Sequence, residues 1–235
     1  MPSYFLPDLK PEVGSIQQLS GQEHHHLSIV SRARIGDRMM LNNGKGILAE
    51  AEITQIDKQS SSFIVTALLS QSLVPRYAIA LSLLKNQNDE LVIEKCTELG
   101  AGEFFPFTSR YSVRKPSPSS ISRFEKIALA AIKQCDNPYL PMINPVMILK
   151  ATLSSIISKG YLPVLCSEKR PDLWADNLDK CDPCFIIGPE GGWSEDEYEL
   201  FKEIPHISIS PLVTRAETAA IAIASQYLLS SRIKS

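Results

Sequence analysis

Residues 185–197 constrain the fold of this chain more strongly than any other stretch. A short apolar run, 185–187, leads into a glycine- and proline-rich segment, 188–192, after which a helix is predicted to begin at Ser194. Ser194 and Glu197 have the spacing of a capping box, in which each side chain accepts a hydrogen bond from the backbone of the other residue. This order predicts a ligand loop at the carboxyl edge of an α/β sheet, although a plain strand-to-helix turn has the same pattern.

The ligand expected at this loop is not a phosphate group. The glycine spacing matches neither the dinucleotide fingerprint nor a P-loop, because no Lys-Ser or Lys-Thr pair follows. Acidic residues occupy positions 195–197 and repel a bound anion. The loop therefore favours a ligand that is neutral or positively charged.

The first 72 residues are predicted to form a small β-barrel or sandwich. Alternating apolar runs at 37–43 and 47–57 flank an Asn-Gly-Lys-Gly segment typical of a hairpin, and a third run follows at 62–69. No long amphipathic helix interrupts these runs, and the segment 22–30 is compatible with a short helix.

From residue 73 onward, predicted strands alternate with predicted helices. The strands are expected at 77–84, 103–107, 161–166, 185–188 and 206–210, and the helices at 88–99, 121–135 and 214–229, with a weaker strand and helix before 159. This alternation predicts an α/β fold, a parallel sheet with helices on both faces. The last helix is expected to start with a second capping box, Thr214 and Glu217, and it is apolar all round at 219–224. Both sides of this helix are therefore expected to be buried, and a homodimer interface is one way to bury the second side.

Histidine and cysteine patterns do not predict a metal site. His24, His25 and His26 are adjacent, so their side chains point in different directions, and a short helix or loop with one packed histidine is expected. Cys181 and Cys184 have redox or zinc spacing, but a strand follows them and no second ligand pair is present. With no bilayer-spanning apolar run and no disulfide framework, we expect a cytoplasmic protein that binds no membrane.

Charge is unevenly distributed along the chain. The segment 104–133 is strongly basic and the segment 168–203 is strongly acidic, while Arg32, Arg34 and Arg38 surround a predicted turn at 35–37. This segregation indicates a basic surface for a polyanion and an acidic region near the glycine loop, although chance clustering on solvated faces gives the same pattern.

A second loop, 210–218, also lies between a predicted strand and a predicted helix, and it carries Arg215, Glu217 and Thr218. Both loops follow the carboxyl ends of strands, where open α/β folds bind ligands. The residues alone thus predict a two-loop pocket, in either an enzyme that acts on RNA or a module that binds it.

The two loops, at 187–194 and 215–219, resemble the signature segments of the RsmE family of SPOUT-class methyltransferases. The resemblance to this family covers nearly the whole chain, with further matching segments at 23–27, 35–37, 94–100, 109–113 and 133–135. The resemblance implies methylation of N3 of a uridine in 16S ribosomal RNA, with S-adenosylmethionine as the cofactor. The expected partners are 16S RNA or the small ribosomal subunit and a second copy of the chain, without a metal.

The resemblance also implies an architecture and a set of site residues. A PUA-like β-barrel that binds RNA is expected at 1–72, and a SPOUT domain with a C-terminal trefoil knot at 73–235, with the active site at a homodimer interface. Arg215 and Glu190 are the expected catalytic residues. The expected cofactor contacts are Leu165, Gly188, Pro189, Glu190, Gly192, Ile209, Ser210, Val213, Thr214 and Thr218. The expected RNA contacts are Arg32, Arg34, Arg110, Arg114, Lys115 and Lys133.

The chain departs from the family pattern at Ser210, Leu212, Thr214 and Ala216. Ser210 replaces a glycine and is expected to crowd the adenine side of the pocket. The alternatives to the leading hypothesis are a non-catalytic RNA-binding or ribosome-assembly protein of the same fold, and a SPOUT methyltransferase acting on another RNA.

Overall fold

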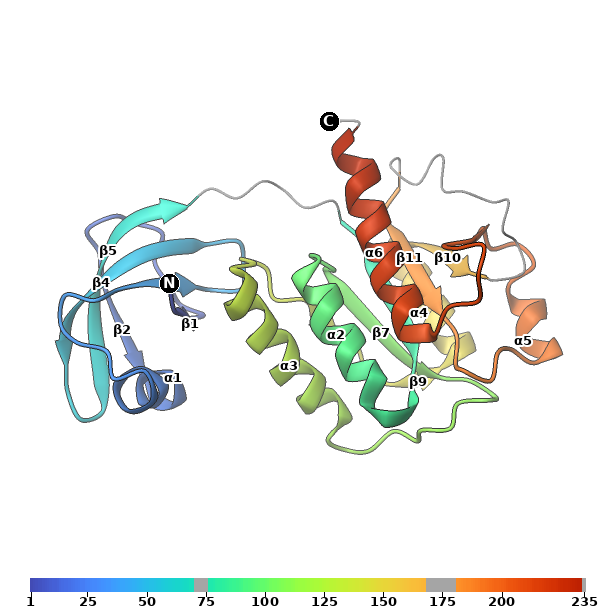
Figure 1. Cartoon of the computed structure of the whole chain (residues 1–235), viewed down its shortest axis with the longest axis horizontal. Helices are drawn as coiled ribbons and strands as arrows, with labels where there is room; N and C mark the ends of the chain where they lie inside the picture. Colours follow the sequence, from blue (N-terminus) through green and yellow to red (C-terminus); the bar gives the residue numbers. More distant parts are fainter. Residues whose placement is uncertain (70–75, 168–180, 234–235) are drawn as a thin grey trace. The chain divides into compact units, whose positions relative to one another are not determined.

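The computed structural model describes residues 1–69, 76–167 and 181–233, and side chains as far as residue 230. The chain divides into two compact units, Met1–Leu73 with Leu129–Leu140 and Val74–Ala128 with Pro141–Ser235 (Figure 1). The expected boundary between residues 72 and 73 lies outside the described residues. Among the helices of the described ranges, none combines the length and apolar character needed to span a membrane.

The N-terminal unit contains a five-stranded mixed sheet. Its strands are β1 (Ser3–Phe5), β2 (Ile16–Ser20), β3 (Arg38–Asn42), β4 (Leu48–Ile56) and β5 (Ser60–Leu69), in the order β1-β3-β4-β5-β2. The predicted hairpin is confirmed, since β3 and β4 pair antiparallel with Asn42 opposite Leu48. Asn43 stabilises its turn, because its Oδ1 accepts hydrogen bonds from the backbone nitrogens of Lys45 at 2.8 Å and Ile47 at 2.9 Å.

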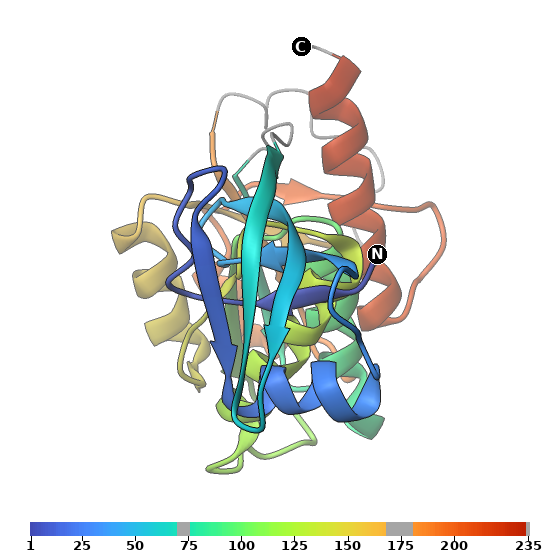
Figure 2. The ribbon, with the colours of Figure 1, turned by 90° about the vertical axis from the view of Figure 1, so that its left-hand side faces the viewer.

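A short helical segment lies at one end of this sheet, where β4 turns into β5 (Figure 2). It consists of α1 (Gly21–His25) and the π-helical turn η1 (His26–Val30), so of the two forms that the sequence allowed, helix or loop, the segment adopts the helix. His24 is buried and its Nδ1 lies 2.8 Å from Ser61 Oγ. The prediction of one packed histidine in this segment is therefore confirmed.

The segment Leu129–Leu140 belongs to the N-terminal unit through contacts with the hairpin and α1. The backbone nitrogen of Gly46 donates to Pro138 O at 2.8 Å, and that of Leu140 donates to Gly44 O at 2.9 Å. Lys133 forms an ion pair with Glu23, with 2.6 Å between Nζ and Oε1.

The C-terminal unit contains a parallel sheet. Its strands are β6 (Ala78–Ser82), β7 (Glu103–Thr108), β8 (Met142–Ile143), β9 (Met147–Ile148), β10 (Leu162–Cys166), β11 (Pro183–Ile187) and β12 (His206–Ile207). The order along the sheet is β12-β10-β11-β6-β7-β8, and β9 also pairs with β7. The last strand, predicted to reach residue 210, ends at Ile207 and leaves the following residues for the pocket described below.

Helices cover both faces of this sheet, as predicted. The helical segments are η2 (Lys85–Gln87), α2 (Asn88–Glu98), α3 (Ser120–Cys135), α4 (Leu149–Ser158), α5 (Glu195–Leu200) and α6 (Ala216–Ile233). Figure 1 shows α2 and α6 side by side on one face of the sheet. Successive strand residues alternate between the two cores: Phe185 and Ile187 pack on the α2/α6 side, and Ile186 packs on the α4/α5 side.

The two cysteines with metal-like spacing belong to different cores, since Cys181 packs partly buried on the α2/α6 side. Cys184 is buried on the α4/α5 side, and burial raises the pKa of its thiol well above the usual value. Within the part of the chain that the structure describes, no group of three His, Cys, Asp or Glu side chains is placed to hold a metal ion. The first part of the predicted acidic region, 168–180, lies outside the described residues, and the rest, 181–203, is described.

Candidate active site

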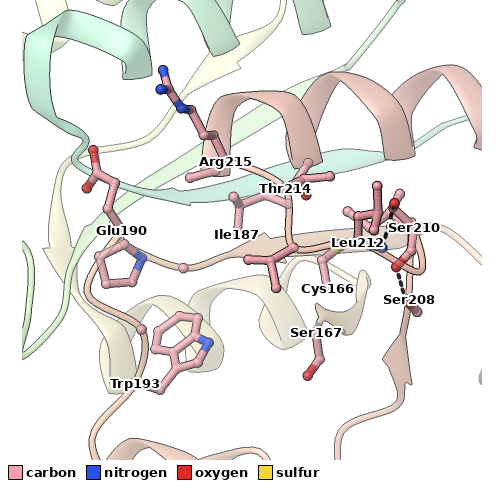
Figure 3. A pocket seen from close by; sticks show the side chains of 17 residues that line it. Cys166, Ser167, Ile187, Glu190, Trp193, Ser208, Ser210, Leu212, Thr214 and Arg215 are labelled. Carbon is pink, nitrogen blue, oxygen red and sulfur yellow. Dashed lines mark hydrogen bonds between the residues drawn. The ribbon is translucent and has the colours of Figure 1, made fainter. Parts of the chain in front are cut away.

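A pocket of about 340 Å³ lies at the carboxyl ends of β10, β11 and β12 (Figure 3). These ends meet at one edge because the strands are parallel and adjacent. The lining residues come from the ends of β10 and β11, from the segments that follow β10, β11 and β12, and from the first turn of α6: Cys166, Ser167, Ile187, Gly188, Pro189, Glu190, Gly192, Trp193, Ser208, Ile209, Ser210, Leu212, Val213, Thr214, Arg215, Ala216 and Ala219.

Trp193 fixes the shape of the loop that follows β11. Its ring stacks on Phe107 at a centroid distance of 6.0 Å and meets the edge of Phe201 at 4.7 Å. A Cβ atom on Gly188 would lie only 2.8 Å from this indole ring. Glycine at 188 thus permits the pocket wall to close against the tryptophan.

The predicted capping box of α5 is confirmed and has a second use. Glu197 Oε2 accepts a hydrogen bond from the Ser194 backbone nitrogen at 2.9 Å. The other oxygen of Glu197, Oε1, accepts one from the Arg110 backbone nitrogen at 2.8 Å. One carboxylate therefore joins the pocket loop to the loop between β7 and α3.

Glu190 holds a strained turn at the end of β6. Its Oε1 accepts a hydrogen bond from the Lys85 backbone nitrogen at 2.9 Å. The next two residues, Asn86 and Gln87, have φ values of 53° and 62°, which non-glycine residues seldom adopt. Each costs on the order of 1 kcal/mol or more, so surrounding contacts such as the one from Glu190 must maintain the turn.

The second loop is stabilised by its own polar groups. Ser210 Oγ accepts a hydrogen bond from the Leu212 backbone nitrogen at 3.0 Å, and Ser208 Oγ donates to Ser210 O at 3.1 Å. The hydroxyl group of Ser210 thus stabilises the loop that it belongs to. The predicted capping position of the last helix is wrong by one residue, since α6 begins at Ala216 and Arg215 O accepts from the Ala219 nitrogen at 2.8 Å.

Glu190 and Arg215 project toward the same edge of the pocket (Figure 3). Arg215 is exposed at the start of α6, and it belongs to none of the ion pairs found between described residues. Its guanidinium group is consequently available for a ligand that carries or develops negative charge.

The structure brings most of the predicted cofactor residues together, with two exceptions. Leu165 and Thr218 do not line the pocket: Leu165 is buried in the α4/α5 core, and Thr218 is exposed on α6. Cys166, the next residue of β10, lines it instead, because side chains alternate along a strand. Ser167, which follows the end of the strand, lines it as well. That alternation was the signal by which Cys166 could have been found from the sequence.

The six predicted RNA contacts differ in their surroundings. Arg32, Arg34, Arg110 and Lys115 are exposed. In contrast, Arg114 forms ion pairs with Asp89 and Glu90, and Lys133 pairs with Glu23. These pairs neutralise part of the basic segment inside the protein.

Comparison with known proteins identifies both units. An RNA methyltransferase domain matches residues 72–228, and an RNA methyltransferase PUA domain matches residues 19–66. Ribosomal RNA small subunit methyltransferase E of Bacillus subtilis is 28% identical over 94% of this chain and 93% of its own length. The corresponding protein of Mesomycoplasma hyopneumoniae is 30% identical over 68% of this chain and 70% of its own length.

The same fold occurs in the crystal structure of a ribosomal RNA small subunit methyltransferase E from Neisseria gonorrhoeae bound to S-adenosylmethionine. It superposes with a TM-score of 0.86 at 22% identity, covering 96% of each chain. The methyltransferase domain match alone spans more than half of the sequence. The chain therefore belongs to the RNA methyltransferase family that includes the ribosomal RNA small subunit methyltransferases E.

Proposed function

We propose that this protein methylates N3 of a uridine in 16S ribosomal RNA of the small subunit, with S-adenosylmethionine as the methyl donor. The observation that carries the proposal is the pocket at the sheet edge, where Glu190 and Arg215 flank one opening. Both residues lie in the segments that resemble the family signatures. The B. subtilis and M. hyopneumoniae relatives that support the proposal are named for activity on small-subunit ribosomal RNA.

The pocket residues suit S-adenosylmethionine. The volume of about 340 Å³ lies at the lower end of the range for small-molecule sites, roughly 300–1,000 Å³. Ile187, Leu212 and Val213 supply apolar walls for an adenine ring, and the adjoining backbone supplies hydrogen-bonding groups. The Glu190 carboxylate and the acidic start of α5 favour the cationic sulfonium.

The chemistry assigns separate tasks to the two charged residues. Methyl transfer forms a bond between uridine N3 and the methyl carbon, breaks the bond between that carbon and the sulfur of the cofactor, and releases the N3 proton. Loss of this proton leaves negative charge on the uracil ring, and the Arg215 guanidinium stabilises that charge. The negative charge of Glu190 stabilises the cationic sulfonium of the cofactor, and its carboxylate maintains the turn at Lys85. A general-base role for Glu190 is a weaker alternative.

A homodimer is part of the proposal. Leu212 and Val213 are 75% and 83% exposed at the pocket rim, and Leu229 is 63% exposed on α6. Apolar side chains this exposed beside a ligand site favour cover by another protein surface. A second copy of the chain would provide that cover, and the trefoil knot implied by the resemblance remains a prediction.

The proposed function predicts a single missing modification in cells without the gene. We expect small-subunit RNA from such cells to lack one N3-methyluridine, and the purified protein to restore it when radiolabelled S-adenosylmethionine is supplied. Mass spectrometry of RNA fragments measures both results. Persistence of every N3-methyluridine in the deletion strain would contradict the proposal, and a failure to bind the cofactor at millimolar concentration would favour the non-catalytic alternative.

Replacement of Gly188 by alanine is expected to destabilise the protein and to weaken cofactor binding. The new methyl group would collide with Trp193, which cannot move away because Phe107 and Phe201 pack on it. Overpacking of this kind costs about 1–3 kcal/mol. Thermal unfolding and calorimetric titration with S-adenosylmethionine measure the two effects.

Gly102→Ala is the matched control for Gly188→Ala. Its Cβ atom would meet only Tyr77 O, at an ordinary contact distance of 3.7 Å. We expect wild-type stability and cofactor affinity in this variant. Equal behaviour of the two variants would show that the contact between Gly188 and Trp193 does not shape the pocket.

A further inference from the structure

Tyr111 is an exposed aromatic residue that lies directly on the pocket loop. It is 47% exposed and belongs to the loop between β7 and α3. A Cβ atom on Gly191 would lie 2.9 Å from Tyr111 Cβ and 3.7 Å from its Cγ. Gly191 does not adopt a left-handed conformation, so the close approach of Tyr111 is the structural reason for a glycine next to Glu190.

The backbone on both sides of Tyr111 is fixed by hydrogen bonds. The Arg110 nitrogen donates to Glu197 Oε1 at 2.8 Å, as described above. The Ser109 nitrogen donates to Ser112 Oγ at 2.8 Å, and Ser112 Oγ lies 2.7 Å from the hydroxyl oxygen of Ser82, which is buried at the end of β6. The ring is therefore presented to solvent from an ordered loop, which lowers the entropy lost when it binds a partner.

Two cations flank this ring in the sequence. Arg110 and Lys115 are exposed, and neither belongs to an ion pair between described residues. The neighbouring Arg114, by contrast, faces inward to Asp89 and Glu90. An exposed aromatic ring beside free cations is the combination with which proteins bind unstacked nucleic-acid bases, because the ring stacks on the base and the cations contact phosphates.

We propose that Tyr111 stacks on the target uridine and holds that base out of the RNA stack at the opening beside Glu190. This inference rests on the proposed function, since N3 lies on the Watson–Crick edge and is reached only when the base is unpaired. A uridine displaced from its neighbours loses stacking energy, and the tyrosine ring replaces part of it. Tyr111 is in this scheme a substrate-positioning residue, whereas Arg215 acts on the charge that develops.

Steady-state kinetics on small ribosomal subunits from a deletion strain test the proposal. Base stacking on an aromatic ring contributes roughly 1–3 kcal/mol. We therefore expect Tyr111→Ala to lower kcat/KM for the subunit by about tenfold and to leave the dissociation constant of S-adenosylmethionine unchanged. Tyr111→Phe keeps the ring and should retain wild-type kinetics, while Tyr111→Leu keeps an apolar side chain without the ring and should behave like alanine.

Tyr139→Ala is a control of matched exposure. Tyr139 is also 47% exposed and also packs on a glycine, Gly46, but it belongs to the N-terminal unit. We expect this variant to keep the wild-type kcat/KM. Equal activity of Tyr111→Ala and wild-type protein, or full activity of Tyr111→Leu, would overturn the stacking role alone. Absence of methylation by the wild-type protein would overturn the proposed function, and the stacking role with it.

Discussion

Replacement of Arg215 by alanine is expected to lower kcat about 100- to 1,000-fold, the loss typical of removing one group that stabilises negative charge in a transition state. The guanidinium lies at the opening of the pocket beside Glu190 and has no carboxylate partner in the described part of the chain. Arg215 lines the pocket at the start of α6, and its side chain is exposed. Truncation to alanine therefore leaves the packed core intact. Initial rates of methyl transfer from radiolabelled S-adenosylmethionine to small subunits measure the effect.

Two further variants separate charge from geometry at this position. Arg215→Lys keeps the charge and loses the planar fork, so we expect a rate between those of alanine and the wild type. Lys202→Ala removes an exposed cation just after α5 that pairs with Glu199, and it should leave the rate unchanged. The cofactor dissociation constant should remain at the wild-type value in all three proteins. A wild-type rate for Arg215→Ala would remove Arg215 from the catalytic assignment.

The periodicity of the sequence was sufficient to predict the sheet and most helices of the C-terminal unit. Buried strands such as β6 and β11 are continuous apolar runs, and α3 keeps helical spacing from Ile121 to Cys135. The end of β12 was predicted less well, since Ile207 is followed by Ser208 and Ile209, which continue the alternating pattern but leave the sheet. Apolar alternation does not reveal that these residues turn to line a pocket.

The site was predictable where a residue acts through the backbone or through its place in a loop. Gly188 and Glu190 follow directly from the strand-to-helix pattern. The partners of the pocket loop were not predictable, because they come from distant parts of the chain. Glu190 reaches the turn at Lys85, and Glu197 reaches Arg110, and no spacing in the sequence indicates either contact.

The exposed charge of the basic segment 104–133 was also not predictable from the sequence, because it depends on contacts with distant residues. Counting residues between 104 and 133 gives six cations against one acid and predicts a basic surface. In the fold, Arg114 and Arg123 both contact Glu90, so the charge that remains for RNA in this segment is concentrated at residues such as Arg110 and Lys115. Net charge along a sequence thus overestimates the charge that a polyanion meets.

Replacement of Arg114 by alanine is expected to have a large effect on the stability of the protein. We expect Arg114→Ala to lower the free energy of unfolding by about 3–5 kcal/mol at neutral pH, as found when one partner of a buried ion pair is removed. The side chain of Asp89 is 0% exposed, and among the described residues its Oδ2 has no hydrogen-bond partner. Without the guanidinium, this carboxylate would be buried with an uncompensated charge. Urea unfolding followed by circular dichroism measures the difference.

Lys115→Ala and a double variant test whether the buried charge of Asp89 causes the stability loss in Arg114→Ala. Lys115 is the adjacent exposed cation, and its removal should change stability by no more than about 0.5 kcal/mol. Asp89→Asn combined with Arg114→Ala removes both charges, so it should be more stable than Arg114→Ala alone. Unchanged stability of Arg114→Ala, together with weaker RNA binding and a smaller salt dependence, would instead assign Arg114 to the RNA surface.

The stability loss in Arg114→Ala should also depend on pH in a defined direction. Burial already raises the pKa of Asp89 in the wild type, and Arg114 opposes that rise. Because the folded-state pKa exceeds the unfolded value, the folded protein binds this proton more tightly, and the resulting stabilisation is greatest below the unfolded pKa and is lost as pH rises through the folded pKa. Removal of Arg114 raises the folded pKa of Asp89 further. The gap in unfolding free energy between variant and wild type should therefore be widest near neutral pH and should narrow on acidification, whereas a loss of packing alone would give a gap independent of pH.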